Sequence, residues 1–150
     1  VGYHPEMILA GRRLNDRMPQ YVVSQLVKRM VKERIQVEGA KVLVMGLAFK
    51  ENCPDLRNTK VVDICRELED YNINADFMDP WCSEDEALIE YGIKLISEYK
   101  QGFYDAIILA VGHDDFKQMG AKFIRSLGKD THVLYDLKYL LPKEDVDIRL

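Results

Sequence analysis

The sequence predicts an α/β fold in which a doubly wound, mostly parallel sheet follows a long or kinked helical arm. From Lys41 onward, apolar runs of strand length alternate with amphipathic helical segments. Single helices between strands imply right-handed crossovers, which place helices on both faces of a parallel sheet. Residues before this alternation show helical periodicity alone, so we expect a helical arm at residues 1–38 and an α/β domain at residues 39–150.

The arm is expected to be helical, with an interruption at Pro19. Pro5 suits the first turn of a helix, whereas Pro19 lacks the amide hydrogen of a helix interior and predicts a kink or a break. Beyond it, apolar residues recur at helical spacing: Tyr21, Val22, Leu26 and Met30. We expect this helix to run to about Val37 and to end at Gly39.

The α/β domain is expected to begin with a buried strand at residues 41–46, because that run is continuously apolar. A helix follows at 59–72, for which Thr59 is a suitable cap, and Ser83 is a suitable cap for the next helix. The remaining expected strands are residues 74–80, 93–97, 105–113 and 132–137, with a possible short one at 146–150. The remaining expected helices are residues 83–92, closed by Gly92, and 121–128, closed by Gly128.

Composition limits the partners of the chain. A net charge of -4 argues against a nucleic acid and against an anionic membrane surface. No apolar run approaches the ~20 residues of a membrane span. Three cysteines without ligand-like spacing indicate reduced thiols in a cytoplasmic protein and no metal site. The abrupt start at Val1 is how a piece of a longer protein begins.

Ligands of doubly wound sheets bind beyond the carboxyl ends of the strands. Three loops are expected there, at residues 46–58, 112–116 and 136–141. The first has a single glycine, Gly46, and carries Lys50 and Arg57 ahead of a helix whose first amides are free for an anion. These features fit a phosphate-bearing ligand, although basic loop residues are also commonly just solvated.

The segment GLAFKENCPDLRNT, residues 46–59, resembles the G-x-x-F-K-x-x-x-x-D-x-R segment of the UDP-glucose/GDP-mannose dehydrogenase family. GRRLND, residues 11–16, is similar to the family's interdomain helix, and YDLK, residues 135–138, to its D-x-R segment. The resemblance is strongest to the branch that oxidises UDP-N-acetylhexosamines to uronic acids for surface polysaccharides. It implies a Rossmann-like, UDP-sugar-binding domain that forms a homodimer through its arm. NAD would be bound mainly by an upstream domain, which also holds the catalytic cysteine.

The resemblance assigns roles to particular residues. Phe49, Lys50 and Lys138 would contact the substrate, and Arg57 would reach the NAD pyrophosphate. Lys138 stands where many relatives have arginine, so it keeps the charge but loses the planar fork. From the residues alone, Phe49 is equally well a core aromatic, and Arg57 a partner of Asp55, which itself would orient the loop.

No catalytic residue is expected in this chain, and Cys53, in the substrate loop, is not the nucleophile. We interpret His113 as a loop hydrogen-bonder and Asp79 as a turn acid, with a ligand role open for both. Packing residues would be Cys65, Trp81 and Cys82, while Arg12 and Arg13 would lie on the linking helix. The alternative function is a stand-alone nucleotide-binding or regulatory module without catalysis.

Overall fold

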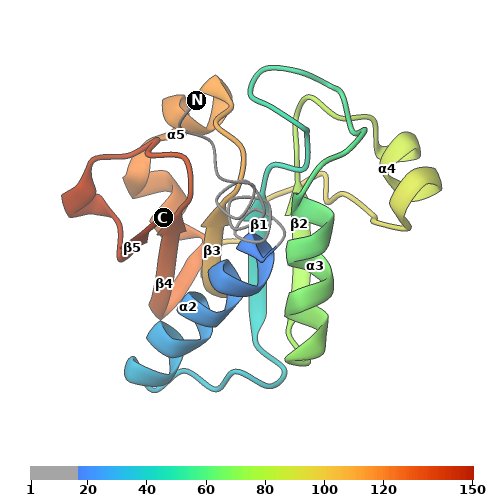
Figure 1. Cartoon of the computed structure of the whole chain (residues 1–150). Coiled ribbons are helices and arrows are strands. Elements are labelled where there is room, and N and C mark those ends of the chain that lie inside the picture. Colours follow the sequence, from blue (N-terminus) through green and yellow to red (C-terminus); the bar gives the residue numbers. More distant parts are fainter. Residues whose placement is uncertain (1–16) are drawn as a thin grey trace, which may run out of the picture.

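A computed structural model describes residues 17–150, which form one parallel sheet with helices on both of its faces (Figure 1). The strands stand in the order β2-β1-β3-β4-β5, and every neighbouring pair is parallel. Their bounds are β1 Lys41–Met45, β2 Asn74–Met78, β3 Tyr104–Leu109, β4 Gly128–Asp136 and β5 Ile148–Arg149. This topology confirms the predicted doubly wound α/β fold.

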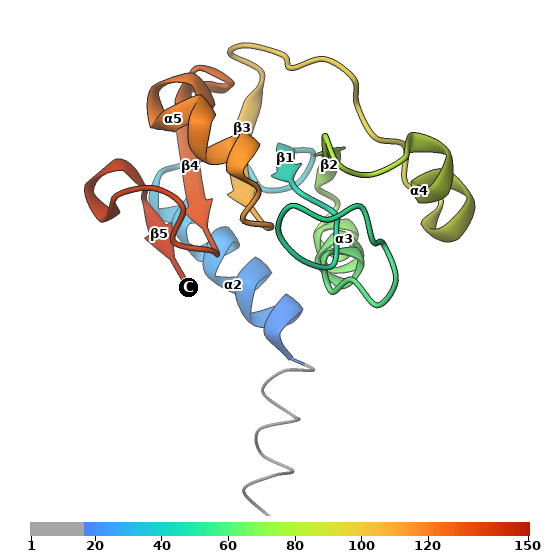
Figure 2. The same cartoon turned by 90° about the horizontal axis from the view of Figure 1, so that it is seen from above.

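The helices form two layers around the sheet (Figure 2). One face is covered by α2 (Met18–Lys32) and α3 (Val61–Asp70), and the other by α5 (Asp114–Ser126). Helix α4 (Glu84–Tyr91) lies beyond the β2 edge, and a short 3-10 turn, η1 (Lys143–Asp145), precedes β5. None of the helices in the part of the chain described by the structure is long and apolar enough to span a membrane.

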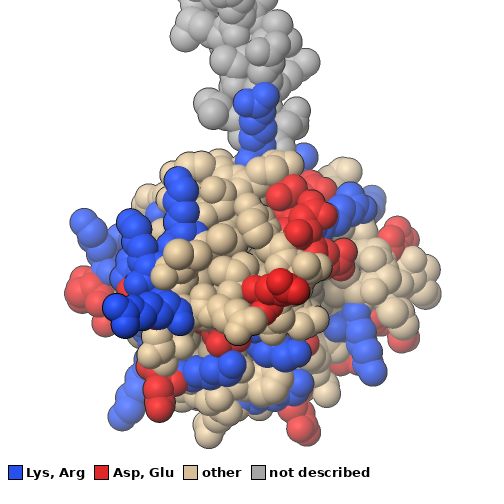
Figure 3. Space-filling model, turned by 90° about the horizontal axis from the view of Figure 1, so that it is seen from below, with Lys and Arg blue, Asp and Glu red and all other residues tan. Residues whose placement is uncertain are grey.

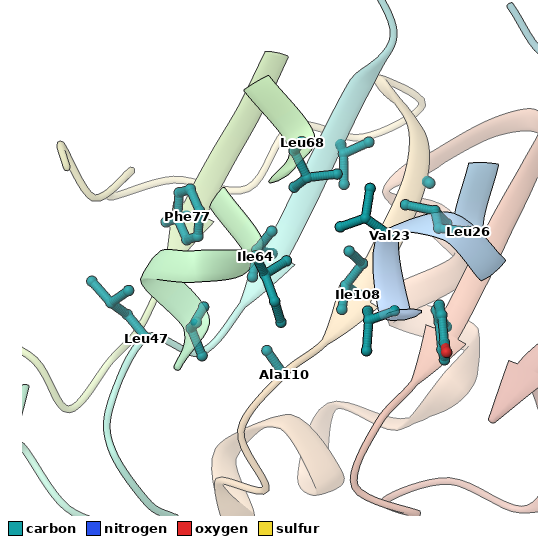
Figure 4. Close-up of a cluster of buried hydrophobic side chains, with 14 of the residues drawn as sticks. Val23, Leu26, Leu47, Ile64, Leu68, Phe77, Ile108 and Ala110 are labelled. Carbon is teal, nitrogen blue, oxygen red and sulfur yellow. The ribbon is translucent and has the colours of Figure 1, made fainter. Parts of the chain in front are cut away.

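The core has two halves because side chains of a strand point alternately to the two faces of the sheet. Val42 and Val44 of β1 belong to the half under α2 and α3, whereas Leu43 and Met45 belong to the half under α5. The larger half is shown in Figure 4, where Val23 and Leu26 of α2 and Ile64 and Leu68 of α3 meet over the sheet. Burial on both faces explains why β1 and β3 read as continuous apolar runs.

Helix α2 is shorter than expected at its carboxyl end. It ends at Lys32 rather than near Val37, because Arg34 adopts a left-handed conformation with φ of 62°. Gly39, with φ of 80°, lies in the turn before β1 rather than at the helix end. Pro19 sits in the first turn of α2, where its missing amide costs nothing. The part of the expected arm before this turn, residues 1–16, lies outside the described residues and includes the predicted linking-helix residues 12 and 13.

The expected strand at residues 93–97 is wrong. Only Leu95 pairs with β2, through a single bridge to Phe77. Ile93 and Leu95 are both buried in the core, so the alternating pattern that predicted a strand reflects side-chain packing without a ladder.

The region around α5 also differs from the prediction. The helix starts at Asp114 rather than at residue 121, and it contains a break at Gly120, whose φ of 78° is non-helical. Gly128 does not close this helix but begins β4. A Cβ at position 128 would lie 2.4 Å from Cγ of His132, so the glycine makes room for that ring.

The helix caps follow the sequence more closely. Ser83 caps α4 by accepting a hydrogen bond from the amide of Glu86 at 3.2 Å, and Gly92 closes the helix in the left-handed region with φ of 67°. The hydroxyl of Thr59 accepts from the amide of Val61 at 3.3 Å, although the N-cap position of α3 itself is one residue later, at Lys60.

Candidate functional site

The strand order has its switch point between β1 and β3. From β1 the chain crosses to β2 on one side, whereas from β3 it crosses to β4 on the other, so the loops that leave these two strands diverge. A crevice beyond the carboxyl ends of such strands is the usual ligand site of a doubly wound sheet. The loops at residues 46–60 and 110–113 meet there.

Gly46 allows these two loops to touch. It has φ of 106°, and a Cβ at this position would lie 2.5 Å from Cβ of Val111 and 2.9 Å from its backbone nitrogen. No side chain fits in that space. The predicted reason for Gly46, a tight exit from the strand, is therefore only part of its role, because the second loop also requires a glycine here.

A buried carboxylate supports the start of the β1 loop. Asp79 Oδ2 accepts hydrogen bonds from the amides of Leu47 at 2.7 Å and Ala48 at 2.9 Å, while Oδ1 accepts from the amide of Trp81 at 2.8 Å. Burial alone would raise the pKa of Asp79. The hydrogen bonds from His113 and from the three amides outweigh it and lower that pKa from 3.8 to about 2. Asp79 is thus a turn acid, as the sequence indicated, but one that holds the ligand loop.

His113 is the partner of this carboxylate, and neither side chain is exposed to solvent. Its Nε2 lies 3.0 Å from Asp79 Oδ2, and its Nδ1 accepts a hydrogen bond of 2.9 Å from the amide of Asn52. Because Nδ1 accepts, Nε2 carries the proton and donates it to the carboxylate. The side chain of Asn52 in turn accepts from the amide of Asp114 at 3.0 Å. Asn52 gave no signal in the sequence beyond being a polar loop residue.

Three of the four predicted site residues line one pocket of about 510 Å³: Phe49, Lys50 and Lys138. The other walls come from the start of α3 and the residues just before it (58–61 and 64), the start of α2 (residues 18, 19 and 22) and residues 48, 51, 110, 111, 137 and 150. Lys50 and Lys138, from loops far apart in sequence, therefore line a common space beside a helix N-terminus, together with Lys60 and one acid, Glu51. This combination can hold a phosphate or a diphosphate.

Phe49 and Lys50 project from the loop rather than into the core. Phe49 is 56% exposed, so the interpretation of it as a buried core aromatic is wrong. Its amide donates to the carbonyl of Asp55 at 2.8 Å, which closes the loop on itself. An exposed aromatic side chain at the rim of a basic pocket offers an apolar surface to a sugar or a base.

Lys138 is held in place by a buried carboxylate of its own. Asp136 accepts hydrogen bonds from the amides of Lys138 and Leu141, both at 3.0 Å, so the loop after β4 turns back toward the switch point. A Cβ added to Gly112 would lie 3.8 Å from Cβ of both Lys138 and Glu51. The three loops therefore converge as the sequence predicted.

Arg57 lies outside this pocket. Its side chain is 87% exposed and makes two hydrogen bonds to Asp55, at 3.1 and 3.2 Å. The side-chain bond from Arg57 is the main cause that lowers the pKa of Asp55. This geometry is the pairing that the sequence offered as the alternative for Arg57. Its contact with NAD stays a prediction.

Burial opposes ionisation of two of the three cysteines. All three are free thiols, and burial raises the pKa of Cys65 to about 11 and raises that of Cys82 still further. Trp81 stacks on the ring of His113 at a centroid distance of 6.0 Å, but it is 41% exposed and its indole nitrogen donates to Asp115, so it packs only in part as predicted. No group of three potential metal ligands occurs among residues 17–150.

A larger hollow of about 750 Å³ lies at the opposite end of the sheet. Its charged lining residues have both signs: Glu33, Arg34, Glu38, Asp105, Lys129 and Asp130. Figure 3 views the molecule from this side, and basic and acidic side chains are interspersed over it. This face lacks the excess of cations that an anionic ligand requires.

Comparison with known proteins gave concordant results. Residues 43–143 match the model of the UDP-glucose/GDP-mannose dehydrogenase family, UDP binding domain. A UDP-N-acetyl-D-glucosamine 6-dehydrogenase of Pseudomonas aeruginosa is 66% identical over 150 residues, which cover 100% of this chain and 36% of that protein. One of Salmonella typhi is 58% identical and is covered to 35%. An NDP-N-acetyl-D-galactosaminuronic acid dehydrogenase from Methanosarcina mazei Go1 shares the fold with a TM-score of 0.81 at 21% identity, over 97% of this chain and 30% of that one.

Proposed function

The chain belongs to the UDP-glucose/GDP-mannose dehydrogenase family, and we propose that it forms the UDP-sugar-binding domain of an NAD-dependent dehydrogenase. The family match confirms the resemblance drawn from residues 46–59. The chain spans about a third of the length of the curated relatives it matches. We propose that the complete protein oxidises the C6 alcohol of a UDP-N-acetylhexosamine to a carboxylate, with two hydrides passing to two NAD molecules, for surface polysaccharide synthesis.

The observation that carries the proposal is the common pocket of Lys50, Lys138 and the α3 N-terminus. A nucleoside diphosphate brings two phosphates, which the flexible ammonium groups of Lys50 and Lys138 can reach from their two loops. Backbone amides in the first turn of α3 add dipoles of the correct sign. The exposed ring of Phe49 would then pack against the base or the sugar.

NAD does not fit the β1–α3 connection of this chain. A dinucleotide fingerprint needs three glycines in a tight turn directly before the helix. Here residues 46–60 separate β1 from α3, and Gly46 is their only glycine. We propose that another part of the complete protein holds most of the cofactor, with Arg57 reaching its pyrophosphate. The exposed guanidinium is compatible with such a contact.

Titration with UDP tests the proposal. A charged hydrogen bond contributes about 1.5–3 kcal/mol, so Lys50→Ala should weaken UDP binding about tenfold to a hundredfold. Arg57→Ala is the matched control, because it removes a cation from the same loop outside the pocket. Equal binding by wild type, Lys50→Ala and Lys138→Ala would show that the pocket is not the nucleotide site. The chain alone, given NAD and UDP-sugar, should produce no NADH.

We also propose a homodimer through the arm. The sequence of the arm carries an apolar stripe that we expect to make the contact: Leu14, Met18, Tyr21, Val22 and Leu26. In the structure, Val22 and Leu26 are buried in the core, whereas Met18 and Tyr21 are 37% and 53% exposed. Leu14, the remaining member, lies outside the described residues. Light scattering tests the dimer, since a chain that stays monomeric at high concentration contradicts the proposal.

We also propose that the protein acts in the cytoplasm, where nucleotide sugars and NAD are available. We propose no nucleic-acid or membrane partner for it.

A further inference from the structure

The loop segment that presents Phe49 and Lys50 is tied down at both of its ends by one buried pair. Asp79 holds the amide of Ala48 just before the segment, and His113 holds the amide of Asn52 just after it. The two anchors are joined by their own hydrogen bond of 3.0 Å. Both side chains are fully buried, so neither can contact a ligand in the pocket.

We propose that His113 is a positioning residue, which holds the nucleotide-binding loop in its binding geometry through the amide of Asn52. This inference rests on the proposed function, because it specifies how the same pocket is built. Lys50 is two residues before Asn52, in a loop outside any strand or helix. Its long side chain can reach a phosphate, but no regular backbone structure fixes its position. His113 fixes the backbone at Asn52 and thereby positions Lys50.

The ring of His113 is itself fixed. Trp81 stacks on it at 6.0 Å and Phe116 packs at 5.4 Å, while both of its nitrogen atoms are engaged in hydrogen bonds. Asn52 extends the connection to the first turn of α5 through the amide of Asp114. A displacement of the loop at Asn52 would break the part-buried bond to His113 and leave the fully buried Nδ1 without its donor, and a buried polar atom left without a partner is costly.

Substitutions can test the roles of Nδ1 and Nε2 of His113 separately. In His113→Asn the amide oxygen takes the place of Nδ1 and can still accept from Asn52. In His113→Gln the amide nitrogen takes the place of Nε2, which keeps the bond to Asp79 but leaves the Asn52 amide without its acceptor. His132→Gln is the control, because His132 makes comparable hydrogen bonds to Arg125 and Lys129 away from the pocket.

The experiment follows the backbone amides of the complete chain by NMR while UDP is added. His113→Gln should weaken UDP binding about tenfold, whereas His113→Asn should stay within about threefold of wild type and His132→Gln should not differ. Equal affinity in all four proteins overturns the proposal. So does a loss in His113→Asn as large as that in His113→Gln, because simple loss of packing would then explain both.

Hydrogen exchange in the unsubstituted protein gives an answer even if a variant fails to fold. The amide of Asn52 should exchange more slowly than those of Lys50 and Glu51, and exchange as fast as theirs overturns the proposal. A wild-type chain that binds no UDP refutes the proposed function instead. In that case the amide shifts of Phe49 and Lys50 still report whether His113→Gln, and not His113→Asn, moves the loop.

Discussion

Replacing Asp79 by asparagine should destabilise the protein strongly at neutral pH and only weakly in acid. The carboxylate accepts four hydrogen bonds, three at Oδ2 and one at Oδ1. Its pKa falls from 3.8 to about 2 on folding, and this shift corresponds to about 2 kcal/mol because one unit is about 1.4 kcal/mol. Asparagine has only one acceptor oxygen, so its amide NH2 group must face at least one of these donors. This mismatch adds about 1 kcal/mol or more to the loss of stability.

The expected loss of about 3 kcal/mol should lower the Tm of a domain of this size by about 6–12 °C. Since the pKa is depressed in the folded state, the stabilisation by ionised Asp79 is complete well above pH 3.8 and is lost as the pH falls through about 2. Urea unfolding at a series of pH values therefore checks the reasoning. The difference between wild type and Asp79→Asn should shrink by about 2 kcal/mol between about pH 5 and about pH 2.

The reasoning is refuted if the difference in unfolding free energy between wild type and Asp79→Asn does not depend on pH. The loop amides would then not stabilise the ionised form of Asp79 more than its neutral form. Asp55→Asn is the matched control, since Asp55 lies in the loop that Asp79 holds and pairs with the exposed Arg57. Pairs of that kind contribute little to stability.

Three further outcomes are expected. Gly46→Ala should destabilise the protein by several kcal/mol in thermal unfolding, because its Cβ would lie 2.5 Å from Val111 at a φ of 106°; unchanged stability would mean that the two loops are not in contact. Ser83→Ala should cost about 1 kcal/mol by loss of the α4 cap, with no effect on UDP binding. Arg57→Ala in the complete enzyme should raise the KM for NAD and leave that for UDP-sugar unchanged, and the reverse pattern would contradict its assignment.

The candidate site was predictable where one short segment carried the chemistry. Phe49 and Lys50 are adjacent in that segment, and Lys138 follows a strand that must end at the same edge of the sheet as β1, whereas Arg57 of the same segment lies outside the pocket. The buried hydrogen bonds that hold the loop of this site were not predictable. Asn52 contributes a backbone amide and His113 a ring nitrogen, and the bond between them joins residues that are 61 positions apart. Nothing local in the sequence encodes such a pairing.

Local physics also explains which elements the sequence determined. The apolar runs of β1 and β3, the cap at Ser83 and the glycine at position 92 depend on neighbours within a few residues, and all of them appear, although β3 ends at Leu109 rather than at residue 113. Tertiary packing decided the rest. The sequence pattern of residues 93–97 predicts a strand, yet they pack side chains into the core without forming a ladder of backbone hydrogen bonds. Gly128 leaves space for the ring of His132 instead of ending a helix. Periodicity reports which side chains are buried, whereas hydrogen-bond partners and close approaches depend on segments that only the folded chain brings together.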